Sequence, residues 1–183
     1  MPAKIMTLII LVACYIVGCS SENRPSIENQ DHEINYVEDV WYSMEEAQAK
    51  AVEENKKIMI FVYTDWCGFC RRMDREIHSS NEVIDIYNDY YYPVRLNAES
   101  DKITTFNGEE FTESQLALAF GVTSYPTTVF IDEAGEPFGS QPGFIEKDTF
   151  KEILSFVGTD AYKSQSFQDF QNNSVLSKDS KSP

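Results

Sequence analysis

Residues Ile58–Met73 read IMIFVYTDWCGFCRRM, and this stretch decides the fold of the chain. The segment Ile58–Tyr63 is rich in β-branched and aromatic residues, which predicts a buried β-strand. Cys67 and Cys70 then form a Cys-x-x-Cys motif that leads into a segment of helical character. A cysteine at the start of a helix lies among free backbone N–H groups and at the positive end of the dipole, both of which stabilise a thiolate. The second cysteine, one turn later, can close a disulfide with the first or resolve a mixed disulfide.

The N-terminal residues look like an export signal. Lys4 precedes an apolar run, Ile5–Val17, that is too short for a permanent membrane-spanning helix. The run closes on Ile-Val-Gly-Cys at residues 16–19, which resembles the lipobox of bacterial lipoproteins, where the cysteine becomes the lipidated first residue. We therefore expect residues 1–18 to be a lipoprotein signal peptide and Cys19 to be lipidated. The alternatives are an ordinary signal with an incidental cysteine and an uncleaved anchor, but Cys19 lies where the apolar run stops, which favours lipidation.

This signal predicts a location in the bacterial cell envelope, lipid-anchored and facing the periplasm. Ser20 follows Cys19, so the aspartate that marks inner-membrane retention in lipoproteins is absent, which slightly favours the outer membrane. With Cys14 inside the signal and Cys19 lipidated, two of the four cysteines remain, and no structural disulfide competes with them. Disulfides persist outside the cytoplasm, so the pair can cycle between its oxidised and reduced forms.

The charge of the chain limits its partners. Its 183 residues include 30 acidic and 15 basic side chains, a net charge of −15. Such a chain is not expected to bind nucleic acid or to adsorb to anionic lipid, so membrane attachment would depend on the acyl chains.

The remaining sequence predicts one domain with flanking segments: a flexible tether at 19–38, the domain at 39–160 and a polar C-terminal tail at 161–183. Within the domain we expect helices at 43–56, 82–88, 113–120 and 149–157, and strands at 90–96, 122–131 and 138–144, with a polar connector at 98–111. Pro93 suggests an edge strand or the start of pairing. The order of elements predicts a parallel first half and an antiparallel hairpin in the second.

His78 raises the question of a metal site. Together with Cys67 and Cys70 it supplies three ligands, whereas a closed zinc site normally has four. The sequence has no further cysteine and no well-placed second histidine to complete the set. We therefore expect no metal, and we place His78 at the exposed end of a helix.

A family resemblance rests on the Trp66–Cys70 motif, on the Tyr125-Pro126-Thr127 turn and on the order of elements, which together resemble the thioredoxin fold. More narrowly, the segment from Trp41 to Leu154 is similar to an exported thioredoxin-like group that includes the C-terminal domain of the membrane thiol:disulfide interchange reductase. The resemblance implies an α/β fold with a central mixed sheet of four or five strands flanked by helices.

The resemblance also implies roles for individual residues. Cys67 would be the exposed nucleophile and Cys70 the buried resolving thiol. Pro126 would follow a cis peptide bond and place the backbone of Tyr125 to pair with an extended substrate. Trp66 would shield the site and form part of the docking surface.

Two departures from the family pattern affect this expectation. Phe61 occupies the position of the family's buried aspartate, which assists proton transfer to the resolving thiol, so Arg95, the approximate match to the family's basic partner, does not have that acid. Asp74, one turn after Cys70, is either a substitute proton acceptor or a solvated helix carboxylate. Gly68-Phe69 between the cysteines lacks the histidine of strong oxidants, which predicts a less oxidising couple and favours reduction of substrates.

These features predict a lipid-anchored thiol:disulfide oxidoreductase that reduces or isomerises disulfides of exported proteins. It would use no cofactor other than its own Cys67–Cys70 pair and would receive electrons from a membrane thiol protein. Two alternatives stay open: a non-catalytic module that binds polypeptides, and an oxidant that forms disulfides.

Overall fold

The computed structural model describes residues 40–179, with side chains as far as residue 173. The predicted signal peptide, the lipidation site Cys19 and the tether at 19–38 lie outside these residues. Within the described part of the chain, no helix combines the length and the apolar character that a membrane span requires.

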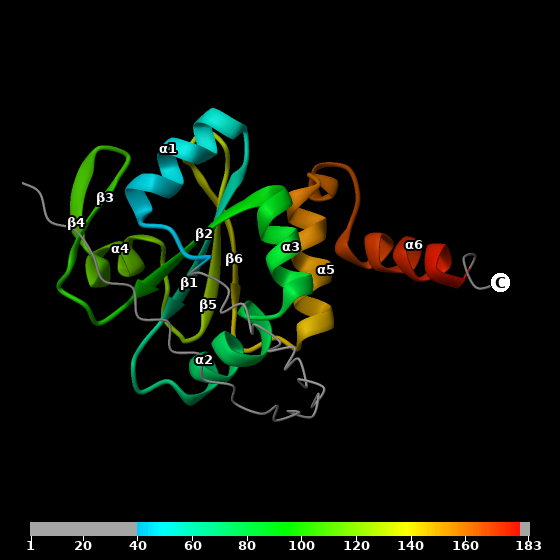
Figure 1. The fold of residues 1–183 in the computed structure, drawn as a ribbon, viewed down its shortest axis with the longest axis horizontal. Coiled ribbons are helices and arrows are strands. Elements are labelled where there is room, and N and C mark those ends of the chain that lie inside the picture. The colour runs from blue at the N-terminus through cyan, green and yellow to red at the C-terminus, as the bar shows by residue number, and fades with distance from the viewer. Residues whose placement is uncertain (1–39, 180–183) are drawn as a thin grey trace, which may run out of the picture. The chain divides into compact units, whose positions relative to one another are not determined.

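A four-stranded sheet in the order β2-β1-β5-β6 forms the centre of the domain (Figure 1). Strand β1 pairs in parallel with β2 and antiparallel with β5, and β5 pairs antiparallel with β6. The predicted mixed sheet, parallel in its first half and antiparallel in its second, is confirmed. Pro93 lies in edge strand β2, as expected. The strands are β1 (Lys57–Tyr63), β2 (Tyr91–Asn97), β5 (Thr127–Ile131) and β6 (Pro137–Pro142).

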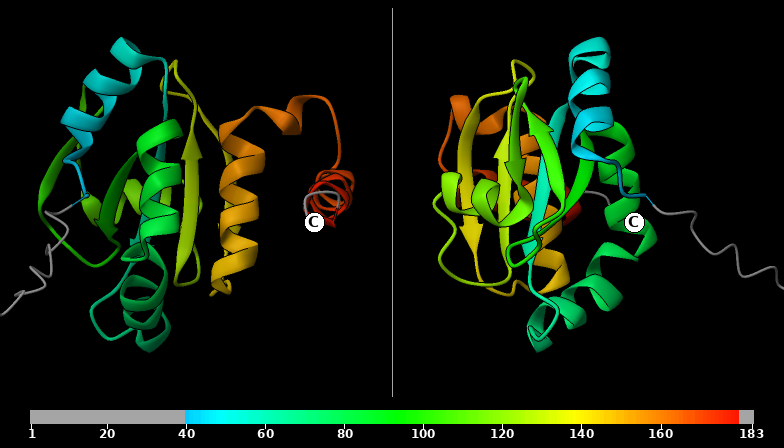
Figure 2. Two further views of the ribbon diagram at one scale, coloured as in Figure 1. Left: turned by 45° about the vertical axis from the view of Figure 1, so that its right-hand side comes forward. Right: turned by 90° about the vertical axis from the view of Figure 1, so that its left-hand side faces the viewer.

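Helices cover both faces of the sheet, because successive side chains of a strand point to opposite faces. Ile58 and Ile60 of β1 pack in the cluster with α1 and α4, whereas Met59 and Phe61 pack in the cluster with α2, α3 and α5. Figure 2 shows α3 and α5 running along the sheet. The helices are α1 (Met44–Glu54), α2 (Gly68–Met73), α3 (Asn81–Tyr90), α4 (Glu113–Ala119) and α5 (Lys147–Gly158).

The segment 98–111 is not merely a polar connector, as the sequence had suggested. It contains a hairpin of β3 (Ile103–Phe106) and β4 (Glu109–Thr112). Its turn residues Asn107 and Gly108 have φ angles of 51° and 81°, the left-handed conformation that two-residue hairpin turns require. Gln48 on α1 holds the hairpin, accepting from the Asn107 N–H (2.8 Å) and donating to the Thr105 carbonyl (2.8 Å).

The C-terminal part also differs in detail from the prediction. Helix α5 begins at Lys147 after the N-cap Glu146, two residues before the expected start. The predicted polar tail contains a short 3₁₀ helix, η2 (Ala161–Lys163), and helix α6 (Phe167–Asp179), which leads away from the sheet in Figure 1. The ring of Phe156 on α5 packs against those of Phe167 and Phe170, at 5.3 Å between centroids in both cases.

Candidate active site

A disulfide joins Cys67 and Cys70 immediately after β1, with 5.2 Å between the two Cα atoms. Cys67 is the N-cap of α2, and its Sγ accepts a hydrogen bond from the Cys70 backbone N–H at 3.0 Å. The motif therefore forms the helix start that the sequence predicted, and the bond shows that the two sulfurs can join.

The prediction of an exposed Cys67 is wrong for this oxidised form. Its exposed fraction is 4%, close to the 2% of Cys70. Both cysteines belong to the buried cluster under α2. Large exposed side chains stand on either side of Cys67 instead, since Trp66 is 66% exposed and Phe69 is 61% exposed. A partner would first meet these aromatic rings.

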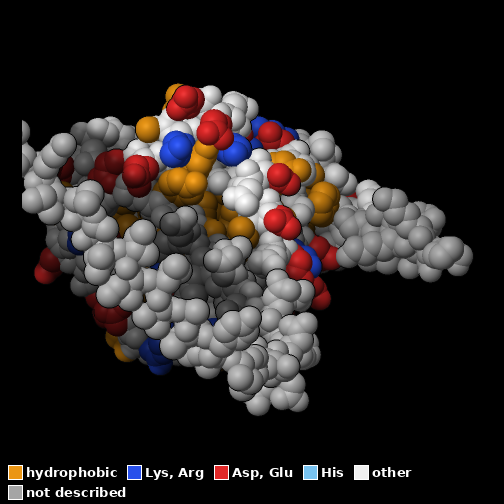
Figure 3. Space-filling model, in the orientation of Figure 1, with side chains coloured by type: hydrophobic (Ala, Val, Ile, Leu, Met, Phe, Trp, Pro, Cys, Tyr) orange, Lys and Arg blue, Asp and Glu red, His pale blue; other side chains and the backbone are white. Residues whose placement is uncertain are grey.

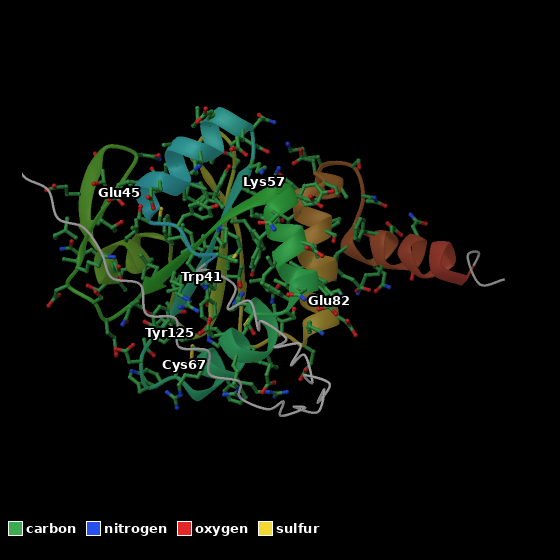
Figure 4. The ribbon with its side chains drawn as sticks, viewed as in Figure 1. Trp41, Glu45, Lys57, Cys67, Glu82 and Tyr125 are labelled. Atoms are coloured by element: carbon green, nitrogen blue, oxygen red, sulfur yellow. A yellow bond between two sulfur atoms is a disulfide. The ribbon has the colours of Figure 1, made fainter. Side chains whose placement is uncertain are left out.

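The loop before β5 lies beside the disulfide because of the strand register. Val62 of β1 pairs with Thr127 of β5, so the residues that follow β1 meet those that precede β5. The Tyr125–Pro126 peptide bond is cis, and the Pro126 carbonyl accepts the Gly143 N–H at 2.7 Å. Figure 4 shows Tyr125 and Cys67 at the same end of the ribbon.

Aromatic contacts fix the two rings that flank Cys67. The Trp66 ring meets the Tyr125 ring edge-on at 6.1 Å, and its Nε1 donates to the Glu99 carboxylate at 2.9 Å. On the other side, Phe69 lies 5.9 Å from Phe144, measured between ring centroids. Sequence reasoning missed the contacts of Glu99 and Phe144 with this site, since both residues lie in irregular segments with no local signal.

A cavity of about 180 Å³ lies behind the disulfide, and Cys70, Asp74 and Arg95 contribute to its wall. Asp74 begins a π-helical turn, η1 (Asp74–His78), and its carboxylate pairs with Arg95. Asp74 therefore gives Arg95 a carboxylate partner in place of the aspartate that Phe61 replaces. Arg95 is the register partner of Phe61, so its side chain is available to the carboxylate one turn beyond Cys70.

The cavity also has polar groups without protein partners. The Thr64 Oγ1 and the Arg95 Nε are both buried and unpaired within the described part of the protein, and both residues line this cavity. Buried polar groups of this kind are normally satisfied by ordered water, for which the cavity has room. Tyr63 lines it as well, and burial, with the Asp65 carboxylate, raises the pKa of its phenol. Cys70 thus faces a polar cavity that contains a carboxylate.

His78 is not at the surface, contrary to the prediction. It is 1% exposed, and its ring lies 4.4 Å from Phe61 and 5.1 Å from Trp41 between centroids. Its Nδ1 is 2.6 Å from the Tyr87 hydroxyl. Burial, followed by the charge of Arg95, lowers the pKa of His78 to about 3, so the imidazole is neutral at physiological pH. The π-helical turn η1 directs the His78 side chain toward the sheet, which is why this histidine lies among aromatic rings and not in solvent.

The described residues include no group of three or more His, Cys, Asp or Glu side chains arranged to hold a metal ion. Six of the seven predicted site residues can be located, and the structure places Trp66, Cys67, Cys70, Asp74, Tyr125 and Pro126 at one end of the sheet. Cys19 lies outside the described part.

A Cys-x-x-Cys disulfide after β1, beside a cis-proline loop, is the site geometry of a thiol:disulfide oxidoreductase. The model of the thioredoxin-like domain matches residues 44–158, and the chain belongs to this family. This membership, together with the Cys67–Cys70 disulfide, supports the activity class of a thiol:disulfide oxidoreductase of the thioredoxin type.

One named relative agrees with this class, and two further matches show similarity without an activity. The chain is 27% identical over 147 residues to the disulfide bond reductase DsbH of Chlamydia pneumoniae, covering 73% of this chain and 88% of that protein. It is 29% identical over 62 residues to an uncharacterised protein of Archaeoglobus fulgidus, covering 34% of this chain and about half (49%) of the relative. Among solved structures, a thioredoxin-fold protein from Helicobacter pylori superposes with a TM-score of 0.57 at 18% identity, covering 75% of this chain and 85% of that one, which supports the fold.

Proposed function

We propose that this protein is a lipid-anchored oxidoreductase that reduces or isomerises disulfides of exported proteins. The observation that carries the proposal is the Cys67–Cys70 disulfide between two exposed aromatic side chains and next to the cis-Pro126 loop. Trp66, Tyr125 and Pro126 would bind an extended substrate segment there, with backbone pairing to Tyr125.

The reaction would begin with the reduced pair. The Cys67 thiolate attacks one sulfur of a substrate disulfide, which forms a mixed disulfide and releases the other substrate sulfur as a thiolate. The Cys70 thiolate then attacks the Cys67 sulfur, which frees the second substrate thiolate and leaves Cys67–Cys70 oxidised. The substrate gains two electrons and the protein loses two. Isomerisation results when a second substrate thiolate attacks the mixed disulfide before Cys70 does.

Asp74 would accept the proton that Cys70 loses in the second step. Its carboxylate shares the cavity behind the disulfide with Cys70, and the pairing with Arg95 holds it in place. General-base assistance of this kind is typically worth two orders of magnitude or more. The polar groups around the cavity would hold a water molecule there. This water could carry the proton from Cys70 to Asp74 if the two side chains do not touch.

Asp74→Asn is therefore expected to slow the resolution step by about 100-fold or more while leaving the first attack by Cys67 unchanged. Single-turnover kinetics with a peptide disulfide would show this as accumulation of the mixed disulfide. Asp85→Asn, which changes an exposed carboxylate on α3, is the matched control. Equal resolution rates in the two variants would remove Asp74 from the mechanism.

Two features support reduction over disulfide formation. Phe69 cannot stabilise the Cys67 thiolate by charge, as a histidine between the cysteines would, so the couple should be less oxidising. The relative from Chlamydia pneumoniae is named a disulfide bond reductase. A measured reduction potential near −270 mV would fit a reductant, and one near about −120 mV would fit an oxidant.

Lipidation at Cys19 would place the domain in the bacterial cell envelope, facing the periplasm, with the outer membrane slightly favoured. Reducing equivalents would come from a membrane thiol protein, and no other cofactor would be needed. Figure 3 shows Asp and Glu side chains scattered over the visible described surface, which fits the net charge of −15 and argues against nucleic acid as a partner.

An insulin-reduction assay with dithiothreitol tests the activity. Wild-type protein should accelerate precipitation of the insulin chains, and Cys67→Ser should give the uncatalysed rate. Val52→Ser, at an exposed position on α1, should behave as wild type. A reduced wild-type sample that is inactive would count against the proposal.

The exposed rings of Trp66 and Phe69 favour one second candidate, a module that binds polypeptides without redox chemistry. This alternative predicts that a Cys67→Ser/Cys70→Ser variant retains partner binding and complements a deletion strain without any redox defect.

A further inference from the structure

The arginines of the described residues gather at the active site. Three lie on α2 and η1, and the fourth, Arg95, lines the cavity behind Cys70. Three of the four have carboxylate partners: Arg72 with Glu76 (2.8 Å) and Glu146 (3.5 Å), Arg75 with Glu76 (2.8 Å), and Arg95 with Asp74. Arg71 forms no ion pair within residues 40–173.

The Arg71 side chain turns back onto the segment that carries Cys67. Its Nη1 donates to the Asp65 carbonyl at 2.7 Å, and its Nη2 lies 3.9 Å from the point that a Cβ would occupy on Gly68. Asp65 and Gly68 lie on either side of Cys67 in the chain, so the guanidinium lies against the turn that presents this cysteine. The Arg71 backbone N–H donates to the Cys67 carbonyl at 3.2 Å, which fixes the same turn.

We propose that the Arg71 guanidinium is the charge partner of the Cys67 thiolate in the reduced protein. The inference rests on the proposed redox function, because only reduction of the disulfide creates this thiolate. When the reduced Cys67 thiol gives its proton to solvent, a negative charge forms on the turn that the Arg71 guanidinium contacts, and this guanidinium is always protonated. A neighbouring arginine stabilises a thiolate in this way.

The other charges near Cys67 do not provide this stabilisation. Asp65 and Glu99 are carboxylates, and they accept hydrogen bonds from Asn97 (3.3 Å) and Trp66 (2.9 Å) respectively.

Asp74 and Arg95 face the site from η1 and β2 but compensate each other, and Arg72 is paired with carboxylates. Tyr63 and Tyr125 contribute phenol groups. Among the described side chains around Cys67, Arg71 is thus the cation that has no carboxylate partner. It would supply the positive charge that a histidine between the cysteines would provide and that Phe69 does not.

The test is the rate of Cys67 alkylation by iodoacetamide as a function of pH, measured on the reduced full chain by peptide mass analysis. In Arg71→Gln the rate near neutral pH should fall by about threefold to tenfold, the effect of removing one solvent-screened charge at short range, and the midpoint of the profile should move to higher pH. Arg71→Lys should recover most of the rate. Arg75→Gln, which removes an exposed arginine one turn further from Cys67, should match wild type.

An unchanged profile in Arg71→Gln, or an equal change in Arg75→Gln, would overturn the inference. Alkylation needs no protein substrate, so this result is independent of the insulin assay. A protein that fails to reduce insulin yet shows the Arg71-dependent profile would refute the proposed function and leave the charge pairing intact.

Discussion

Replacing Cys70 by alanine is expected to stop turnover and to leave partner proteins covalently attached to Cys67. The first attack requires only the Cys67 thiolate, which the substitution leaves in place. Release of the mixed disulfide requires a second thiol, and Cys70 is the partner that the structure shows bonded to Cys67, with 5.2 Å between the Cα atoms. Without it, the covalent complex should last until an external thiol cleaves it. Insulin reduction should fall to the uncatalysed rate.

The trapped partners would be separated from cell envelopes by non-reducing electrophoresis and identified by mass analysis. Cys67→Ser/Cys70→Ala is the matched control, because it keeps the same surface and lacks the attacking sulfur. Bands that vanish with added reductant and are absent from the control would name the substrates and the electron donor. Equal bands in both variants would mean that the adducts form at Cys14 or Cys19, and the assigned role of Cys67 would fail.

Acid is expected to destabilise the fold through His78. Burial lowers the pKa of His78 from 6.5 to about 3, so between these values the unfolded chain binds a proton that the folded protein does not. The stabilising contribution of the neutral imidazole is therefore complete above pH 6.5 and is lost as the pH falls toward 3. Between pH 7 and pH 4 this loss is about 3 kcal/mol of unfolding free energy.

Removing the titrating group isolates this contribution from that of the carboxylates. His78→Phe alone leaves the buried Tyr87 hydroxyl without its partner, which costs about 1–3 kcal/mol at every pH. His78→Phe/Tyr87→Phe removes both polar groups and should fold with a smaller loss. Urea unfolding at pH 7 and pH 4 should then show a drop about 3 kcal/mol smaller in the double variant than in wild type. A drop of the same size in both proteins would show that His78 does not control acid stability.

The sequence predicted the fold and the reactive pair because both are signalled locally. Ile58–Tyr63 is buried along almost its whole length as β1, and the Cys-x-x-Cys spacing places two sulfurs one helical turn apart. The helices predicted at 43–56 and 113–120 were found for the same reason, since the capping boxes at Ser43 and Thr112 involve groups only three residues apart. The 103–112 hairpin was missed because its strands are short and partly exposed, so the alternation is weak.

By itself, then, the sequence determined the thioredoxin-like architecture, the identity of the two cysteines and the proline loop that accompanies them. Only the tertiary structure decided the surroundings of these groups: that Asp74 reaches Arg95, that His78 is buried among aromatic rings, that Cys67 is covered in the oxidised form, and that Arg71 folds back beside it. The composition of a strand and the cap of a helix are signals within a few neighbouring residues, whereas charge pairing and burial depend on which distant side chains the packed sheet brings together.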